Sequence, residues 1–568
     1  MGKVDSPSAL NRLAGLPLAP DREWKTRRLI FVGVFVLALG FAMYTRHAWE
    51  DYYITYRVSK NLATGHGLVF TVGERVHVFT SPLNVLIPAG LTLLTCNRSD
   101  ELVLWLFRVM SSGLLAGAAV LLYESGRKNC LRMIPLAVLV GMFGLDAKIV
   151  DFSINGQETA FMMFFLALAL HALTVPSNWT ILRLGLAGAG LMWTRPDAFV
   201  YFGAITIGFV LFNAGRAIGQ SRVALLRTVL SAGLITALLY LPWLIWAWHY
   251  YGSAVPHTIV AKGLIREAVP LRADDLLGNL VTLPLEMLLG NTAGENMFLP
   301  AYAKSFGGWH WAVTVYARVL ALLCAFYWLF PFGRPQGRAV SFACMIGIFY
   351  LSAIVPYPSP WYMPNCTILG VFAFAHIVQQ GLDLALRLKD QKPNAFRLTV
   401  AGVRVLAAAV LLTVAGLLVC AAWQLRVQQR EIETAGRRQI GLWLRQHAAS
   451  PKDTVFLEPL GYVGYFSQLK MLDFPGLSAP EVVAAERKLR SFKAATLIPE
   501  LKPVWLVLRR AEADRISETA PDLLTQDYSE VKVFDATPRL ASYRWLPGRG
   551  YLEFDAQFIV FKRNSPKS

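Results

Sequence analysis

Two neighbouring acids, Glu50 and Asp51, follow directly after Leu29–Tyr44, an apolar segment with the character of a membrane span. A predicted helix then carries two bases, Arg57 and Lys60. A carboxylate can accept the proton of a weakly nucleophilic hydroxyl, and lysine or arginine can stabilise a phosphate leaving group. The pattern therefore fits proton abstraction beside an anion. Two plainer roles stay open: the acids could cap the helix, and the bases could contact lipid headgroups.

More polar residues interrupt the apolar sequence in four short segments, NGQET, TRPD, HYYGSAVPHTIVAKG and SPWYMPN. Lys262 stands alone in a nearly uncharged stretch, which suits an anionic ligand. Glu158 could instead favour a helix N-terminus, and Arg195 could simply pair with Asp197. The aromatic residues could belong to an interfacial belt. The candidates in these segments are Glu158, Arg195, Asp197, His257, Lys262, Trp361 and Tyr362.

The composition indicates a membrane protein. Of 568 residues, 55% are hydrophobic and only 16% are charged, whereas soluble proteins carry about 25% charged residues. Apolar runs of spanning length recur along the chain. The net charge of +18 comes largely from lysines and arginines in short loops, where they set orientation, so no nucleic-acid partner is expected. The six cysteines have neither metal nor disulfide spacing, and no metal site is predicted.

The loop charges predict a topology. Lys25 and Arg27 precede the first span and place the N-terminus in the cytoplasm, so the two acids fall outside. Pro82–Thr95 is short and interrupted by Pro88, so we expect it to lie in the interface rather than to cross. About eleven spans are expected, and eight of them lie near residues 29–44, 102–123, 131–150, 159–173, 181–193, 199–212, 228–248 and 401–423. The other three lie between the last two of these: the eighth span returns to Arg334, the ninth leaves at Pro356, and the tenth returns to Arg387.

Three parts are predicted: a cytoplasmic tail at 1–24, a transmembrane domain at 25–424 and an extracytoplasmic α/β domain at 425–568. In the last part, strands are expected at 453–459, 503–509 and 556–563, and a serine-capped helix is expected at 478–492. With this topology, all the polar candidates lie at the outer ends of spans. Ionisable groups in such places are functional candidates, and they predict an outer cavity.

A sugar carried on a polyprenyl phosphate suits such a cavity, because its tail stays in the bilayer while its headgroup lies at the surface. The sequence contains no GxxxxGK[ST] loop, and a nucleotide sugar would not be available outside. Two alternatives stay open. A transporter or flippase for a lipid-linked glycan should carry polar residues through the membrane midplane. A ligase or polymerase should accommodate a whole lipid-linked glycan.

The segment WEDYYITYRVSKNLATGHGLVFTVGERVHVFTSPL resembles the first outer loop of the GT-C superfamily of integral-membrane glycosyltransferases. The likeness is greatest to the branch that holds the mycobacterial terminal arabinofuranosyltransferases. That branch has two aspartates where this chain has Glu50 and Asp51. The shared positions of the loop are Asn61, Leu62, Gly65, Gly67, Phe70, Gly73, Glu74, Arg75, Val76, Thr80 and Ser81. Residues 250–262, 156–159, 194–197 and 460–481 resemble the same branch.

The resemblance implies a GT-C fold, with Asp51 as the catalytic carboxylate and Glu50 as its partner. It implies a polyprenyl-phosphate donor carrying arabinofuranose or a similar sugar, and a glycan, lipid or protein acceptor. The bacterial inner (plasma) membrane is the expected location. The sugar, the acceptor, the stereochemical outcome, the use of a divalent cation, the oligomeric state and the role of the C-terminal domain stay open. The donor-binding candidates are Arg57, Lys60, Glu158, Arg195, Asp197, His257, Lys262, Trp361 and Tyr362.

Overall fold

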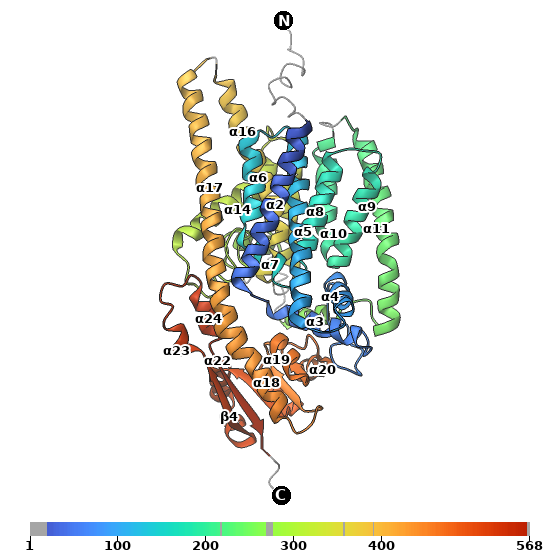
Figure 1. The fold of residues 1–568 in the computed structure, drawn as a ribbon, viewed down its shortest axis with the longest axis vertical. Coiled ribbons are helices and arrows are strands. Elements are labelled where there is room, and N and C mark those ends of the chain that lie inside the picture. The colour runs from blue at the N-terminus through green and yellow to red at the C-terminus, as the bar shows by residue number, and fades with distance from the viewer. Residues whose placement is uncertain are drawn as a thin grey trace.

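The computed structural model describes residues 20–215, 219–268, 276–292, 294–355, 358–389 and 391–564. A helical bundle forms one end of the molecule, and a small domain with a sheet forms the other (Figure 1). Of the predicted tail at 1–24, residues 1–19 lie outside the described part of the chain, and the last five begin helix α2 (Pro20–Thr45).

Seven of the described helices are long and apolar enough to cross a membrane. Each coincides with a span predicted from the sequence, so the chain is a polytopic helical membrane protein. They are α2, α5 (Asp100–Lys128), α11 (Arg222–Tyr251), α14 (Trp311–Phe326), α15 (Pro335–Phe349), α16 (Pro364–Arg387) and α17 (Pro393–Gln428).

The other four predicted spans correspond to shorter helices. Three stand beside the long helices in the bundle, namely α8 (Thr159–Thr174), α9 (Thr180–Thr194) and α10 (Ala198–Leu211) (Figure 1). The predicted span at 131–150 is two helices, α6 (Met133–Leu145) and α7 (Ala147–Ile154), which meet at 45°. The break occurs at Asp146, whose carboxylate accepts hydrogen bonds from the backbone N–H groups of Lys148 and Ile149 and so caps α7.

Two helices lie at the end of the bundle that faces the sheet. They are α3 (Glu50–Ala63), which carries the acids, and α4 (Leu83–Leu94), which contains Pro88. Helix α4 packs on α3 beside the end of α5 and does not run along the bundle (Figure 1). This position agrees with the prediction that the segment does not cross. The long loop after α11 contains two further helices, α12 (His257–Ala268) and α13 (Leu276–Leu288).

One helical segment joins the bundle to the sheet domain. Helix α17 continues through η6 (Gln429–Arg437) into α18 (Arg438–His447), so residues 393–447 form one stretch of helix. It passes without a break through residue 424, where the sequence analysis places a domain boundary.

The sheet domain has five strands in the order β2-β1-β3-β5-β4. β1 is parallel to β2 and β3, and β5 is antiparallel to β3 and β4. The strands are β1 (Thr454–Leu457), β2 (Lys470–Asp473), β3 (Trp505–Arg509), β4 (Tyr528–Asp535) and β5 (Gln557–Arg563). The helices are α19 (Leu460–Ser467), α20 (Pro480–Leu489), α21 (Ala494–Leu501), α22 (Arg510–Thr519), α23 (Thr537–Leu540) and α24 (Arg549–Phe554).

The three predicted strands are present as β1, β3 and β5, and the predicted helix is α20. The prediction of a capping serine was wrong. Helix α20 begins after Ala479 without a side-chain cap, and the hydroxyl of Ser478 donates instead to Asp473, 2.6 Å away. Buried Asp473 also accepts the backbone N–H of Ser478, so the serine closes a turn at the end of β2.

Candidate active site

The two acids occupy the first turn of α3, and the start of this helix is attached to the bundle. The residue before the helix, Trp49, donates its indole N–H to Asp151 on α7, 3.0 Å away, and its backbone N–H to the carbonyl of Asn155. No side chain caps α3. Glu50 and Asp51 are therefore not capping residues, although the helix N-terminus favours their negative charge.

Glu50 faces the sheet domain. One of its carboxylate oxygens accepts the backbone N–H of Gly461 at 2.6 Å, and the other lies 4.0 Å from the Arg437 guanidinium. Burial raises the pKa of Glu50 to about 8, although the charge of Arg437 opposes the shift. Gly461 is required here, because a Cβ at this position would lie 2.0 Å from the carbonyl oxygen of Glu50.

Asp51 has different neighbours. Burial raises its pKa to about 6, the positive charge of Lys262 opposes this shift, and the negative charge of Glu158 adds to it. The described residues donate no hydrogen bond to its carboxylate. At neutral pH, Asp51 is therefore mostly ionised and able to accept a proton, whereas Glu50 mostly keeps its proton. Two neighbouring carboxyls with separated pKa values allow different roles in acid–base chemistry.

A charged cluster surrounds the ring of Tyr362. The Arg195 guanidinium lies 4.3 Å from the ring centroid, and the Lys262 ammonium lies 6.0 Å from it. Arg195 binds Asp197 and Glu158, each at 2.9 Å. The structure therefore brings together five of the predicted candidates near Asp51, although they are separated widely in sequence. The local pairing of Arg195 with Asp197 is also present.

Trp361 lies at the edge of this cluster. Its ring stacks on Tyr362 at 6.2 Å and meets Phe152 of α7 edge-on at 6.5 Å. These contacts attach the loop before α16 to the same helix that holds Trp49.

The structure does not bring Arg57, Lys60 or His257 into this group. Arg57 is buried and donates to the backbone carbonyls of Gly464 and Leu469, so its guanidinium connects α3 to the sheet domain. The Lys60 ammonium forms a 2.7 Å ion pair with Asp100.

His257 begins α12, and its backbone N–H donates to the carbonyl of His77. Burial lowers the pKa of the His257 imidazole, and its charged neighbours are Glu481 and Arg487 of the sheet domain. His257 therefore lies against α20 rather than against the cluster around Tyr362.

Glu458, which follows β1 in the sheet domain, is not among the site residues predicted from the sequence. Its carboxylate forms a 2.6 Å ion pair with Arg509, and its negative charge raises the pKa values of both Glu50 and Asp51. A signal was available, because ligands of α/β sheets often bind beyond the carboxyl ends of parallel strands, and Glu458 lies at the carboxyl end of the strand predicted at 453–459.

A buried network of ion pairs includes Arg437 and Arg509, the arginines that lie next to Glu50 and Glu458. Arg509 and Arg437 each bind Asp555 at 2.5 Å, and Arg437 also binds Glu433 at 3.0 Å. Buried charges in proteins are normally paired in this way. The network connects the last helix of the bundle to two distant segments of the sheet domain, so it holds both acidic residues in place.

A stacked aromatic pair lies near the same acids. The rings of Tyr302 and Tyr551 are parallel within 8°, with centroids 4.2 Å apart, and Tyr302 also contacts Trp49. Burial raises the pKa of Tyr302, and electrostatic repulsion from Tyr551, Asp51 and Glu458 adds to this effect. Stacked aromatic rings commonly provide rigid contact area in binding sites.

Among the described residues, no group of three or more His, Cys, Asp or Glu side chains is placed to hold a metal ion.

Comparison with known proteins identifies one relative with a similar sequence and several solved structures that align with the chain. The chain is 29% identical to a terminal β-(1→2)-arabinofuranosyltransferase from Corynebacterium glutamicum, over 237 residues. The match covers 38% of this chain and about a third (32%) of that relative. The solved oligosaccharyltransferase from Archaeoglobus fulgidus, in complex with Zn and sulfate, has a similar fold, with a TM-score of 0.50 at 12% identity over 84% of this chain and 68% of that one. The resemblance to GT-C glycosyltransferases is confirmed.

Two other solved structures align with this chain over nearly its whole length, at 13% identity. Arabinofuranosyltransferase AftD from Mycobacteria has a TM-score of 0.48 and is covered over 40% of its length, with 97% of this chain aligned. ArnT from Cupriavidus metallidurans, bound to undecaprenyl phosphate, has a TM-score of 0.46, with 98% of ArnT and 96% of this chain aligned. Residues 423–553 match a domain of unknown function, DUF8728.

Proposed function

We propose that the protein is a glycosyltransferase that moves a sugar, arabinofuranose or a similar pentose, from a polyprenyl-phosphate donor to an acceptor hydroxyl. The acceptor is a glycan, a lipid or a protein. The observation that carries this proposal is the partly buried carboxylate of Asp51, which accepts no hydrogen bond from the described residues and lies within the electrostatic influence of Lys262. The activity of the arabinofuranosyltransferase relative supports the sugar class.

In the proposed reaction, Asp51 accepts the proton of the acceptor hydroxyl as its oxygen attacks the anomeric carbon of the sugar. The bond between that carbon and the donor phosphate oxygen breaks, and polyprenyl phosphate leaves with both electrons of the bond. Lys262 and Arg195 stabilise the leaving phosphate, because charge-assisted hydrogen bonds to phosphate are about twice as strong as neutral ones. Glu50 keeps its proton and positions the start of α3 against Gly461.

We place this site at the outer face of the bacterial inner membrane, since the basic loops then fall in the cytoplasm. In this orientation the last helix delivers an outer domain at 425–568, after a transmembrane domain at 25–424. The sheet domain contributes Glu458 beside the acids, so we assign it a role in binding the acceptor.

The competing function is transport or ligation of a lipid-linked glycan. The two acids lie on α3, at the end of the bundle that faces the sheet domain (Figure 1), and transport sites typically lie near the membrane midplane. This placement favours transfer at one surface over passage through the membrane.

The test supplies a radiolabelled polyprenyl-phosphate pentose and a panel of acceptors to the protein in lipid, and compares wild type with Asp51→Asn. Loss of a general base should lower the transfer rate by about 10²- to 10⁴-fold, while donor binding stays intact. Glu530→Gln is the matched control, because Glu530 is an exposed acid of the sheet domain. Equal rates in wild type and Asp51→Asn would remove Asp51 as the base, and no transfer from any such donor would reopen the transport alternative.

A further inference from the structure

Helix α3 also lines a second cavity, of about 540 Å³, to which it contributes Tyr52 and Tyr53 instead of the two acids. The cavity lies between the ends of α2 and α5 and the helix that runs from α17 into α18. We call it the arginine cavity. It shares Arg46 and Arg426 with an open groove of about 680 Å³ at the end of α2.

The arginine cavity is strongly basic. Two acids also line it, Asp100 and Glu101, but Asp100 is compensated by the Lys60 ammonium at 2.7 Å. One of the lining arginines, Arg430, is paired with Glu431 at 2.6 Å. Arg46 and Arg438 form no ion pair with the described residues. The arginines come from three separate parts of the chain, the segment after α2, helix α5 and the helix from 393 to 447: Arg46, Arg108, Arg426, Arg430 and Arg438.

Two residues that line the cavity each carry a buried polar atom with no hydrogen-bond partner among the described residues, namely Nε of Arg108 and the hydroxyl of Tyr52. The Arg108 side chain is 2% exposed, and one terminal nitrogen donates to the carbonyl of His47 at 2.6 Å. Buried polar groups in proteins are nearly always paired, so these two point to a ligand. Both atoms are hydrogen-bond donors, which favours a ligand with oxygen acceptors.

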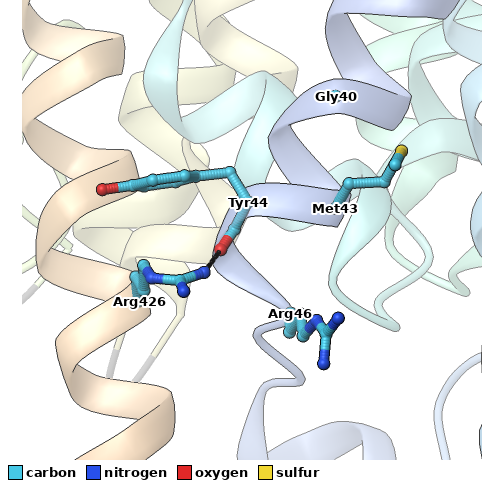
Figure 2. Close-up of a pocket in the computed structure, with 5 residues that line it drawn as sticks. All are labelled: Gly40, Met43, Tyr44, Arg46 and Arg426. Atoms are coloured by element: carbon cyan, nitrogen blue, oxygen red, sulfur yellow. Dashed lines mark hydrogen bonds between the residues drawn. The ribbon is translucent and has the colours of Figure 1, made fainter.

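The open groove beside the arginine cavity is lined by exposed side chains at the end of a candidate membrane span. Met43 is 61% exposed and Tyr44 is 46% exposed at the end of α2, one of the candidate spans. Figure 2 shows Arg426, from α17, beside Tyr44, to whose carbonyl it donates a hydrogen bond, while Arg46 extends from the segment after α2. Apolar side chains therefore continue directly into a basic cavity, an arrangement that matches a lipid chain and its headgroup.

We propose that the arginine cavity binds the phosphate headgroup of an anionic membrane lipid, whose first chain carbons follow the groove beside Met43 and Tyr44. Arginine is well suited to this ligand, because its planar guanidinium binds phosphate oxygens with two parallel hydrogen bonds. The site is separate from the one around Asp51, and the proposal does not depend on glycosyl transfer.

The experiment measures lipid binding to the full-length protein by native mass spectrometry from detergent, with added phosphatidylglycerol or phosphatidylcholine. The double variant Arg46→Gln/Arg438→Gln is compared with Arg445→Gln/Arg515→Gln, which removes the same charge from exposed arginines outside the cavity. We expect wild type and the control to bind one phosphatidylglycerol at least about tenfold more tightly than the double variant does. Phosphatidylcholine should bind weakly to all three.

Thermal unfolding shows whether the variants are folded, and two results would overturn the proposal. Equal affinity of the two double variants for phosphatidylglycerol would mean that the cavity is not the lipid site. Full displacement of the lipid by millimolar inorganic phosphate would mean that the cavity is a site for a free anion. Conservative replacement by Arg46→Lys/Arg438→Lys should restore part of the affinity, because the charge returns without the planar fork.

Discussion

The pH dependence of transfer tests the proposed base directly. With a pKa of about 6, Asp51 changes from about 90% ionised at pH 7 to about 10% ionised at pH 5. If ionised Asp51 is the base, single-turnover transfer should fall about tenfold over this interval. An aspartate with the ordinary pKa of 3.8 would stay mostly ionised, and the rate would change little.

Lys262→Met sharpens the test. The positive charge of Lys262 lowers the pKa of Asp51, so its removal should raise that pKa and move the acidic limb of the profile to higher pH. The assay is single-turnover transfer with saturating donor, so that donor affinity does not distort the profile. The residual activity of Asp51→Asn should have no such limb. A flat wild-type profile between pH 5 and pH 7, or the same limb in Asp51→Asn, would show that Asp51 is not the base that titrates.

Three other predictions follow from contacts around α3. Glu458→Gln removes a negative charge, so the pKa of Asp51 should fall and the acidic limb should move to lower pH in the same assay. Arg57→Met leaves two buried carbonyls without their donor and should destabilise the protein by about 1–3 kcal/mol, seen as a lower melting temperature with donor affinity unchanged. Loss of donor binding without loss of stability would instead give Arg57 a direct role. Gly461→Ala should force the sheet domain away from Glu50 and lower both melting temperature and activity, and a wild-type melting temperature would contradict this.

The transmembrane architecture could be predicted because it depends on composition. An apolar run of sufficient length identifies a span without any knowledge of its neighbours, and basic loops order the spans. The bend at Asp146 was missed, because one polar residue in an apolar run does not reveal that its carboxylate caps a new helix. Strand β4 was missed because its alternating charged residues are exposed at the edge of the sheet, and only its first residue is buried.

The candidate site was only partly predictable, because long-range contacts have no local signal. The cluster of Arg195 and Lys262 was anticipated as a group, since both follow spans at the same predicted side. Arg57 looked equally suitable, yet its guanidinium is occupied by carbonyls more than 400 residues away. Arg437 and Asp555, which are 118 residues apart, form their ion pair only through the fold.

The helix of 55 residues from Pro393 to His447 also determines how the sheet domain can be positioned. At about 1.5 Å per residue it is roughly 80 Å long, whereas the hydrocarbon core of a bilayer is about 30 Å thick. Much of this helix therefore extends beyond the hydrocarbon core, and it holds the sheet domain at a fixed distance from the membrane. A deletion of seven residues near the centre of the helix would leave its helical phase almost unchanged and would move the sheet domain about 10 Å towards the bundle. The length of this helix therefore determines how far Glu458 and Gly461 of the sheet domain lie from the acids of α3.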